Sequence, residues 1–316
     1  FPFVFEVIVK DDERAFLTRD GRFERLLGPG RFKQLDIGRR LKAEIVKAVR
    51  TELPADKALL IERTHPEIAE ANFSIVQAAA HEVAIVSFDG EAKHIVMPNS
   101  TRAFWKTLTA VDVDMIDASA DPRVAKRHQE KMDLTRNALV TFALVEAHEV
   151  GLLFIDGKLV EKLAAGRHAF WNVNRTVRVQ KVDLRSTPLE VTAQEILTKD
   201  RVGIRVTLTA FTKVVDAEKS VLASGDVNAT VYKLVQFAIR EAVAARSLDE
   251  ILAARDTIDA QVRAFVSGRV AALGIEIGEI GVKDVILPGD VRELLNKVVE
   301  AERTAKANLI RRQEET

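Results

Sequence analysis

The 316-residue sequence contains no cysteine, and this absence excludes several kinds of chemistry at once. Without thiols the chain has no disulfides, no thiolate nucleophile, no thiolate zinc ligand and no site for palmitoylation. Disulfides are also rare in reducing compartments. We therefore expect a cytoplasmic protein, lying peripherally at the cytoplasmic face of the cell membrane if it meets a membrane.

The sequence also lacks an excess of either charge and any long apolar run. Lys plus Arg and Asp plus Glu both total 47, so the electrostatic footprint of a nucleic-acid binder is missing. The longest nearly apolar segment, 138–145, is far shorter than the roughly 20 residues that a membrane-spanning helix needs. We expect no nucleic-acid partner, and membrane contact that is indirect or made by segments outside this chain. The Phe at position 1 and the charged helical pattern at the end suggest that both ends are trimmed.

One short segment occurs three times. Each copy begins with Glu, continues with apolar and β-prone residues, and reaches an Asp-Gly pair whose glycine lies eight residues after the Glu. Asp-Gly supplies the two positive φ angles of a tight primed turn, so each copy predicts a β-hairpin. Nine residues after each Asp-Gly glycine comes a residue that tolerates left-handed backbone. The copies are 13–21, 82–90 and 149–157, and the later turn residues are Gly30, Asn99 and Gly166.

The copies are 69 and 67 residues apart, which is longer than most solenoid units. We therefore interpret them as duplicated small β domains. Trp105 and Trp171 close the second and third copies at equivalent positions, and we expect both to have the same packing role in their domain cores. The polar stretch 121–132 predicts a solvated linker between the second and third copies. Between the first and second copies, 55–71 has a helical composition that is interrupted at Pro66.

After the third copy the hydrophobic period changes. Residues 177–184 and 202–210 alternate as half-buried strands do, and 227–242 then places apolar residues on one helical face. Ser247 and Glu250 form a capping-box pattern, and Gly274 is a natural helix stop. We predict an N-terminal β-rich region at 1–120, a linker at 121–135, a first subdomain at 136–200, an α/β second subdomain at 201–288 and an assembly helix at 289–316.

The final helix carries an apolar seam. Its residues are spaced by 3, 4, 3 and 4, which is typical of a coiled coil, and the seam shrinks from Val and Leu to Ala. Small seam residues allow neighbouring helices to approach closely, so we expect this helix to join copies of the chain. The alternative is a helix packed on its own domain. The predicted interface residues are Val291, Leu294, Val298, Ala301 and Ala305.

From about residue 149 onward the sequence resembles the stomatin/prohibitin/flotillin (SPFH) superfamily, and bacterial slipins in particular. Eight segments carry the resemblance and occur in the family's order. They are 151–157, 165–171, 194–200, 246–252, Arg255, 273–275, 282–288 and 301–307.

The resemblance implies an α+β fold: tandem β-hairpin-rich SPFH-type domains, an α/β subdomain and a C-terminal coiled-coil-like helix. It further implies a homo-oligomeric ring or cage that organises a membrane microdomain or its proteins, and a membrane partner of the NfeD type. A regulatory or chaperone-like subunit of a membrane protease is the alternative function. The residues carried over as structural family motif are Asp156, Gly157, Gly166, Thr198, Asp200, Arg255, Leu287 and Pro288.

No pattern in the sequence predicts catalysis, a cofactor or a metal site. His81-Glu82 and His148-Glu149 lie in strand patterns, and neither His has a second His four residues later, as a zinc helix requires. No Gly-x-Ser-x-Gly elbow is present. We therefore expect no enzymatic activity.

Overall fold

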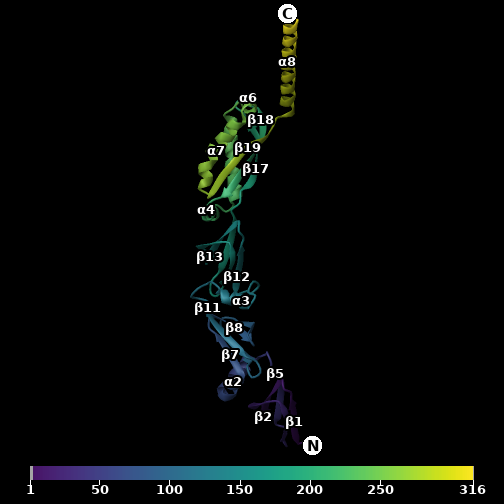
Figure 1. The fold of residues 1–316 in the computed structure, drawn as a ribbon, viewed down its shortest axis with the longest axis vertical. Helices are drawn as coiled ribbons and strands as arrows, with labels where there is room; N and C mark the ends of the chain where they lie inside the picture. Colours follow the sequence, from purple (N-terminus) through teal and green to yellow (C-terminus); the bar gives the residue numbers. More distant parts are fainter. Residues whose placement is uncertain (1–2, 316) are drawn as a thin grey trace. The chain divides into compact units, whose positions relative to one another are not determined.

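The computed structural model describes residues 3–315 and confirms a mixed α+β chain of hairpin-rich β domains, an α/β subdomain and a C-terminal helix (Figure 1). The chain divides into two compact units, and the boundary between them runs through the third β domain. The first unit contains the first two β domains and part of the third. The second contains the rest of the third domain and everything from Gln180 onward.

Each copy of the repeat is a domain of five strands, and the strand lengths are six, seven, six, six and seven residues in all three. The Asp-Gly pair lies between the second and third strands, as the sequence predicts. The first domain has β1 (Val4–Val9), β2 (Glu13–Arg19), β3 (Arg22–Leu27), β4 (Gly30–Leu35) and β5 (Leu41–Lys47). The second has β7 (Phe73–Ala78), β8 (Glu82–Phe88), β9 (Glu91–Val96), β10 (Ser100–Trp105) and β11 (Val111–Asp117). The third has β12 (Val140–Val145), β13 (Glu149–Ile155), β14 (Lys158–Leu163), β15 (Gly166–Trp171) and β16 (Val177–Asp183).

The strands of each domain form the same two sheets. The first and fourth strands pair as a ribbon, and the third, second and fifth form a three-stranded sheet. In the second domain β6 (Glu52–Leu53) adds to the ribbon beside β10. The ribbon registers match between domains, because Val4 pairs with Leu35 in the first and Phe73 pairs with Trp105 in the second. Leu35 and Trp105 therefore occupy equivalent places.

The repeated Asp-Gly pair has the backbone of a primed turn in every copy, with φ of 48–52° at Asp and 77–85° at Gly. In two copies the Asp also ties the hairpin to the start of the fifth strand. Asp89 N donates to Ala110 O at 2.8 Å, and Asp89 Oδ1 accepts Ala110 N–H at 3.0 Å. Asp156 and Thr176 make the same two bonds, both at 2.9 Å.

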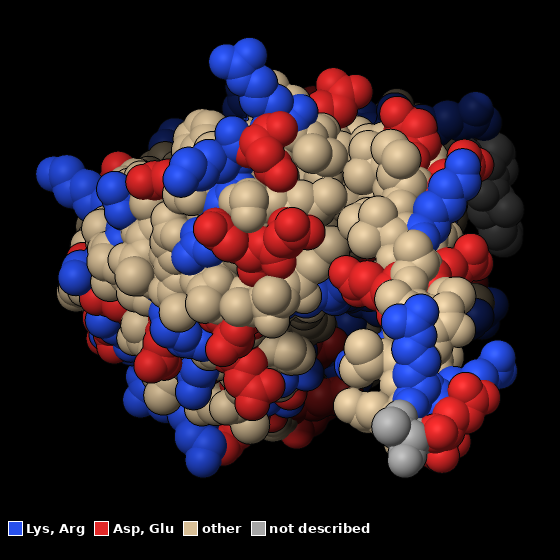
Figure 2. All heavy atoms as spheres, turned by 90° about the horizontal axis from the view of Figure 1, so that it is seen from above, with Lys and Arg blue, Asp and Glu red and all other residues tan. Residues whose placement is uncertain are grey.

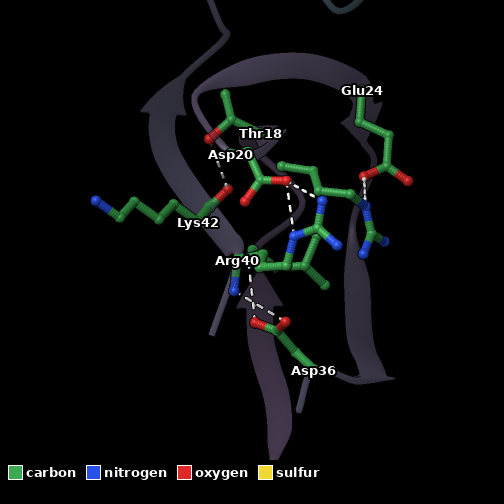
Figure 3. Close-up of polar contacts among 8 residues, drawn as sticks. Thr18, Asp20, Glu24, Asp36, Arg40 and Lys42 are labelled. Atoms are coloured by element: carbon green, nitrogen blue, oxygen red, sulfur yellow. Dashed lines mark hydrogen bonds and ion pairs between the residues drawn. The ribbon is translucent and has the colours of Figure 1, made fainter. Parts of the chain in front are cut away.

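In the first domain, the second of these two bonds comes from the side chain of Arg40 instead of from a backbone N–H. Asp20 N donates to Arg40 O at 3.0 Å, and Arg40 Nε donates to Asp20 Oδ2 at 2.7 Å (Figure 3). The backbone N–H of Arg40 is bonded instead to Asp36, a buried carboxylate that also accepts the N–H of Leu41, each at 2.9 Å. A buried carboxylate with two N–H donors is satisfied, so Asp36 shapes this loop.

The repeated Glu is also structural. In each copy its carboxylate accepts the backbone N–H three residues earlier, and its own N–H donates to the carbonyl of that same residue. This closes the turn between the first and second strands. The pairs are Glu13 with Lys10, Glu82 with Ala79 and Glu149 with Glu146.

In the first two domains, the inner faces of ribbon and sheet form the domain's own core. Val9, Ala15 and Leu17 are buried together in the first, and Val76, Val86 and Phe104 in the second. Because side chains alternate along a strand, the residues between them point to outer faces. At the junctions, a ribbon contacts the preceding domain through its outer face, and a three-stranded sheet contacts the following domain through its outer face.

At each of the two junctions, the outer face of a ribbon packs against the outer face of the preceding domain's three-stranded sheet. Trp105 and Phe73 on the second ribbon share a core with Phe16 on β2. Trp171 on the third ribbon shares a core with Val83 on β8. The packing role expected for both tryptophans is confirmed, but both side chains lie between domains instead of inside one.

The expectation that 121–132 is a solvated linker is wrong for two of its side chains. The stretch contains α3 (Lys126–Lys131), in which His128 is buried, and Val124 shares a buried core with Trp171, as does Leu134 just after the stretch. His128 Nε2 lies 2.9 Å from Asp114 Oδ2 on β11. Helix α1 (Ala55–Thr64) and helix α2 (Pro66–Asn72) fill the other junction, with the break predicted at Pro66.

The second unit contains an antiparallel sheet of β17 (Thr187–Leu197), β18 (Gly203–Val214) and β19 (Ile275–Ile286), with β18 in the middle. Two long helices pack on it, α5 (Val227–Ala244) and α7 (Arg255–Ala271) (Figure 1). Two short helices, α4 (Ala217–Leu222) and α6 (Leu248–Ala253), complete the subdomain. The capping box predicted at Ser247 and Glu250 is present at the start of α6.

Candidate assembly surface

The last helix, α8 (Gly289–Glu314), has 26 residues and none of them is buried. It begins after Pro288, whose φ of −54° suits a helix start. Two residues in its first turns contact the rest of the subdomain: Val291 and Leu295 are partly buried against the core under α5 and α7. Beyond them the helix is exposed.

The structure places the five predicted interface residues on one face of α8. Leu294 is 63% and Val298 52% exposed, and Ala301 and Ala305 are exposed as well. Val291 instead packs partly against its own subdomain. The chain's own core therefore leaves the exposed part of the seam uncovered. The alternative, a helix packed on its own domain, does not hold for this part of α8.

The apolar face of α8 extends beyond Ala305, the last apolar residue of the heptad series. A heptad places Asn308 next, but at about 100° per residue Leu309 falls on the same face, and it is 59% exposed. Sequence reasoning missed Leu309, together with the exposed Val299 and Ile310, because it followed a 3.5-residue period.

Charged residues of both signs surround the apolar faces of the molecule. On the side shown in Figure 2, Lys and Arg alternate with Asp and Glu, and no area of one sign dominates. The same mixture holds along α8, where Glu300 and Arg303 lie one turn apart. Association through α8 would therefore rest on apolar burial, with charges setting which faces meet.

Thr198 and Asp200 form a clamp between two elements of the second subdomain. Thr198 Oγ1 donates to Asp200 Oδ1 at 2.5 Å and accepts the N–H of Val202 at 2.9 Å. The same Asp200 oxygen accepts the N–H of Leu248 at the start of α6, at 3.2 Å. The hydrogen bond from Thr198 holds the pKa of the Asp200 carboxyl below its ordinary value. The clamp thus joins the β17–β18 turn to α6.

The other residues of the predicted family motif lie apart from this clamp. Asp156 and Gly157 form the turn of the third hairpin, and Gly166 follows with φ of 137°. Leu287 packs against the subdomain core next to Pro288 and α8. Arg255 is exposed at the first residue of α7. The structure therefore distributes the motif over several turns and brings no catalytic group together.

Comparison with known families decides the identity of this half of the chain. The model described as SPFH domain / Band 7 family matches residues 143–316, which is more than half of the sequence. The chain belongs to the SPFH/Band 7 family. The match starts at the third β domain, so the SPFH region comprises that domain, the α/β subdomain and α8. The first two β domains lie outside it.

Several proteins resemble the SPFH region at similar levels. A protein of Archaeoglobus fulgidus is 30% identical over 168 residues, which cover 53% of this chain and 67% of that protein. A stomatin homolog of Pyrococcus abyssi is 30% identical over 52% of this chain and 61% of its own length. Stomatin-4 of Caenorhabditis elegans is 29% identical over 56% and 63%. The chain therefore spans about two thirds or less of these three relatives.

Family membership supports a general class of function. The stomatin relatives place the chain in a family of membrane-associated scaffold proteins that are generally not enzymes. No described helix is both long and apolar enough to cross a bilayer. Within residues 3–315, no three His, Asp or Glu side chains group closely enough to hold a metal ion. His81 Nε2 lies 3.9 Å from Glu82 Oε1.

We expect Asp200→Ala to destabilise the SPFH region, because it leaves the N–H of Leu248 and the hydroxyl of Thr198 without their acceptor. The melting temperature measured by circular dichroism should fall by roughly 2–4 °C at pH 7. Since the folded pKa of Asp200 is lowered, its contribution is present above the unfolded pKa of about 3.9 and is lost as pH falls through the folded value. The difference from wild type should therefore shrink below about pH 4.

The matched control is Lys199→Ala, which changes the exposed neighbour and keeps the bond from Lys199 N to Arg246 O at 2.8 Å. It should leave the melting temperature unchanged. Equal melting temperatures for Asp200→Ala and Lys199→Ala at pH 7 would contradict the assignment of a clamp.

Proposed function

We propose that this protein is a non-enzymatic scaffold of the slipin type, whose copies assemble through α8 into a ring or cage that organises a membrane microdomain or its protein partners. The observation that carries the proposal is the exposed apolar face of α8 in a member of the SPFH/Band 7 family. Burying a Leu or Val side chain yields about 1.5–3 kcal/mol. A helix that exposes Leu294, Val298 and Leu309 on one face gains that stabilisation by packing against other copies.

The shape of the face fits helix-to-helix packing. Ala301 and Ala305 lie between the larger residues, and small side chains allow the axes of two helices to come close, near the lower end of the usual 8–10 Å spacing. A small-molecule site would instead need a concave pocket. The face of α8 has the convex surface of a single helix, so a protein partner with the same kind of face fits it best.

We expect Leu294→Asp to abolish the assembly, because a charge would be buried in the interface without a partner. Mass photometry of the chain should give many-protomer particles for wild type and particles of far smaller mass for the variant. Circular dichroism should show the same secondary structure in both, because Leu294 is 63% exposed within the chain. Val298→Asp should have the same effect.

The control for this prediction is Ala307→Asp, which places the same charge on the opposite side of α8, at an exposed position. Its particles should match those of wild type. Wild-type protein that stays monomeric at micromolar concentration would overturn the proposal, and unchanged particles of Leu294→Asp would overturn the assigned interface.

We extend the proposal to an integral membrane partner of the NfeD type, which would hold the assembly at the cytoplasmic face of the cell membrane. The support is family membership alone. Affinity purification from detergent-solubilised native membranes tests it, with Leu294→Asp as a comparison. Recovery of one membrane protein in fixed proportion to the wild-type assembly is expected, and recovery of the scaffold without any membrane protein would contradict it.

A further inference from the structure

The outer face of the first ribbon, formed by β1 and β4, is exposed, although the equivalent face of the third domain is buried. In the third domain the apolar residues of this face belong to the core shared with the second domain. They are Val140, Trp171 and Val173. The matching strand and loop lengths place Val4, Leu35 and Ile37 at the equivalent positions of the first domain, where they are 42%, 65% and 70% exposed. No described part of the chain covers this face.

Hydrogen bonds hold the loop that carries Ile37. Besides the two N–H groups that its buried carboxylate accepts, Asp36 donates its own backbone N–H to Phe3 O at 2.7 Å (Figure 3 shows the carboxylate). Its carbonyl accepts the N–H of Arg39 at 3.2 Å. These bonds join the β4–β5 loop to the start of β1. A buried carboxylate is tolerated only when it is hydrogen-bonded, so the shape of this loop is specified while Ile37 is left in water.

We infer that this face binds the same face of a second copy, so that two chains associate through their first domains about a two-fold axis. The contact is separate from the one proposed for α8. In both junctions a ribbon packs on the outer face of a three-stranded sheet, but the sheets that the structure describes have no such face free. The outward residues at the middle of their central strands, Phe16, Ile85 and Leu152, are at most 2% exposed. A second copy therefore offers its own ribbon face, and a face that packs on itself gives a closed dimer.

The charges on the face are complementary to themselves. Glu6 lies directly across the ribbon from Lys33, and its carboxylate pairs with Lys33 at 3.3 Å and with Arg31 at 2.6 Å. A two-fold axis parallel to the strands lays β1 of one copy over β4 of the other. Glu6 of each copy then faces Lys33 of the other, and Val4 faces Leu35. An axis across the strands would set Glu6 against Glu6, and like charges across an interface oppose association.

The small size of the face predicts a weak dimer. β1 and β4 have six residues each, which gives a face about 20 Å long and about 10 Å wide. Contacts of this size lie at the lower end of specific interfaces. We therefore expect dimers at micromolar concentration and separate chains at nanomolar concentration. Because the contact joins two chains, it does not contribute to unfolding measured on separate chains.

The Leu294→Asp variant is the background for the test, because it removes the assembly proposed for α8 and leaves the first domains unchanged. Sedimentation velocity at micromolar concentration should show a dimer. Adding Ile37→Asp should give the monomer, because a charge would be buried in the contact without a partner. The matched control is Leu108→Asp, in the equivalent loop of the second domain, where the side chain is 43% exposed. This control should leave the dimer intact.

Charge reversal tests the pairing across the axis. Glu6→Lys and Lys33→Glu, each added to the Leu294→Asp chain, set like charges against each other in a homodimer, so each variant alone should sediment as a monomer. In an equimolar mixture every such contact is again between opposite charges, and heterodimers should form.

A Leu294→Asp chain that is monomeric throughout the micromolar range, or dimers that persist with Ile37→Asp, would overturn the inference. Monomers that instead bind phosphatidylglycerol vesicles and lose this binding with Ile37→Asp would assign the face to lipid, and would overturn it as well. If wild type does not assemble through α8, the proposed function fails, and the same comparison made in wild type still tests the dimer.

Discussion

Trp105→Ala should lower the free energy of unfolding of the β domains by about 3–5 kcal/mol, the usual cost of deleting a buried aromatic side chain. Trp105 is 0% exposed at the junction between the first two domains. Its ring meets Phe73 edge-on at 5.0 Å between centroids and lies 5.6 Å from Phe16 of the first domain. Truncation leaves a cavity that neither domain can fill by itself, so the two domains should separate more readily.

The matched control is Leu35→Ala, at the equivalent position of the first ribbon, where the side chain is 65% exposed. Its effect should stay within about 0.5 kcal/mol. Urea unfolding followed by far-UV circular dichroism measures both. If the two substitutions cost the same, Trp105 does not hold a junction, and if Trp105→Ala costs less than about 1 kcal/mol the packing is looser than the structure shows.

Gly274→Ala should be the most damaging small substitution in the SPFH region, with an expected cost of about 2–5 kcal/mol. Gly274 follows α7 with φ of 69°, which L-residues adopt only with strain. A Cβ atom there would lie 2.2 Å from the backbone oxygen of Asp216. Gly274 O also accepts the N–H of Val215 and of Asp216, at 2.9 and 3.1 Å, so the backbone cannot shift freely.

Gly268→Ala is the matched control, because Gly268 lies inside α7 and a Cβ there meets nothing within 4 Å. Alanine favours a helix over glycine by about 0.5–1 kcal/mol. Thermal unfolding should therefore show opposite shifts for the same chemical change, upward at 268 and downward at 274. A neutral Gly274→Ala would mean that the turn after α7 relaxes without cost.

The features predicted correctly from sequence depend on short stretches of chain. The hairpin turns follow from Asp-Gly alone, and the capping box at Ser247 needs only four residues. The SPFH assignment also rested on local motifs in their order. The helix break at Pro66 is likewise a consequence of one side chain.

The features that sequence reasoning missed depend on contacts between distant residues. Nothing near Trp105 in the sequence shows that its ring would meet Phe16, because that contact requires two sheets to stack. The burial of His128 depends in the same way on a neighbouring strand that carries Asp114. On α8 the exposed Val299 and Ile310 were missed for a different reason, since a 3.5-residue period leaves them out. The predicted segment boundaries and interface residues stay predictions.

The two junctions between β domains have a consequence for how such a chain can evolve. Both use the same pair of surfaces, a ribbon carrying Trp and the back of a three-stranded sheet, even though the intervening segments differ in sequence and in helix content. Tandem duplication of one β domain would therefore give a chain in which the additional domain packs through the same pair of surfaces. Selection can change the number of β domains without requiring a new kind of contact between them, and the SPFH region that follows need not change.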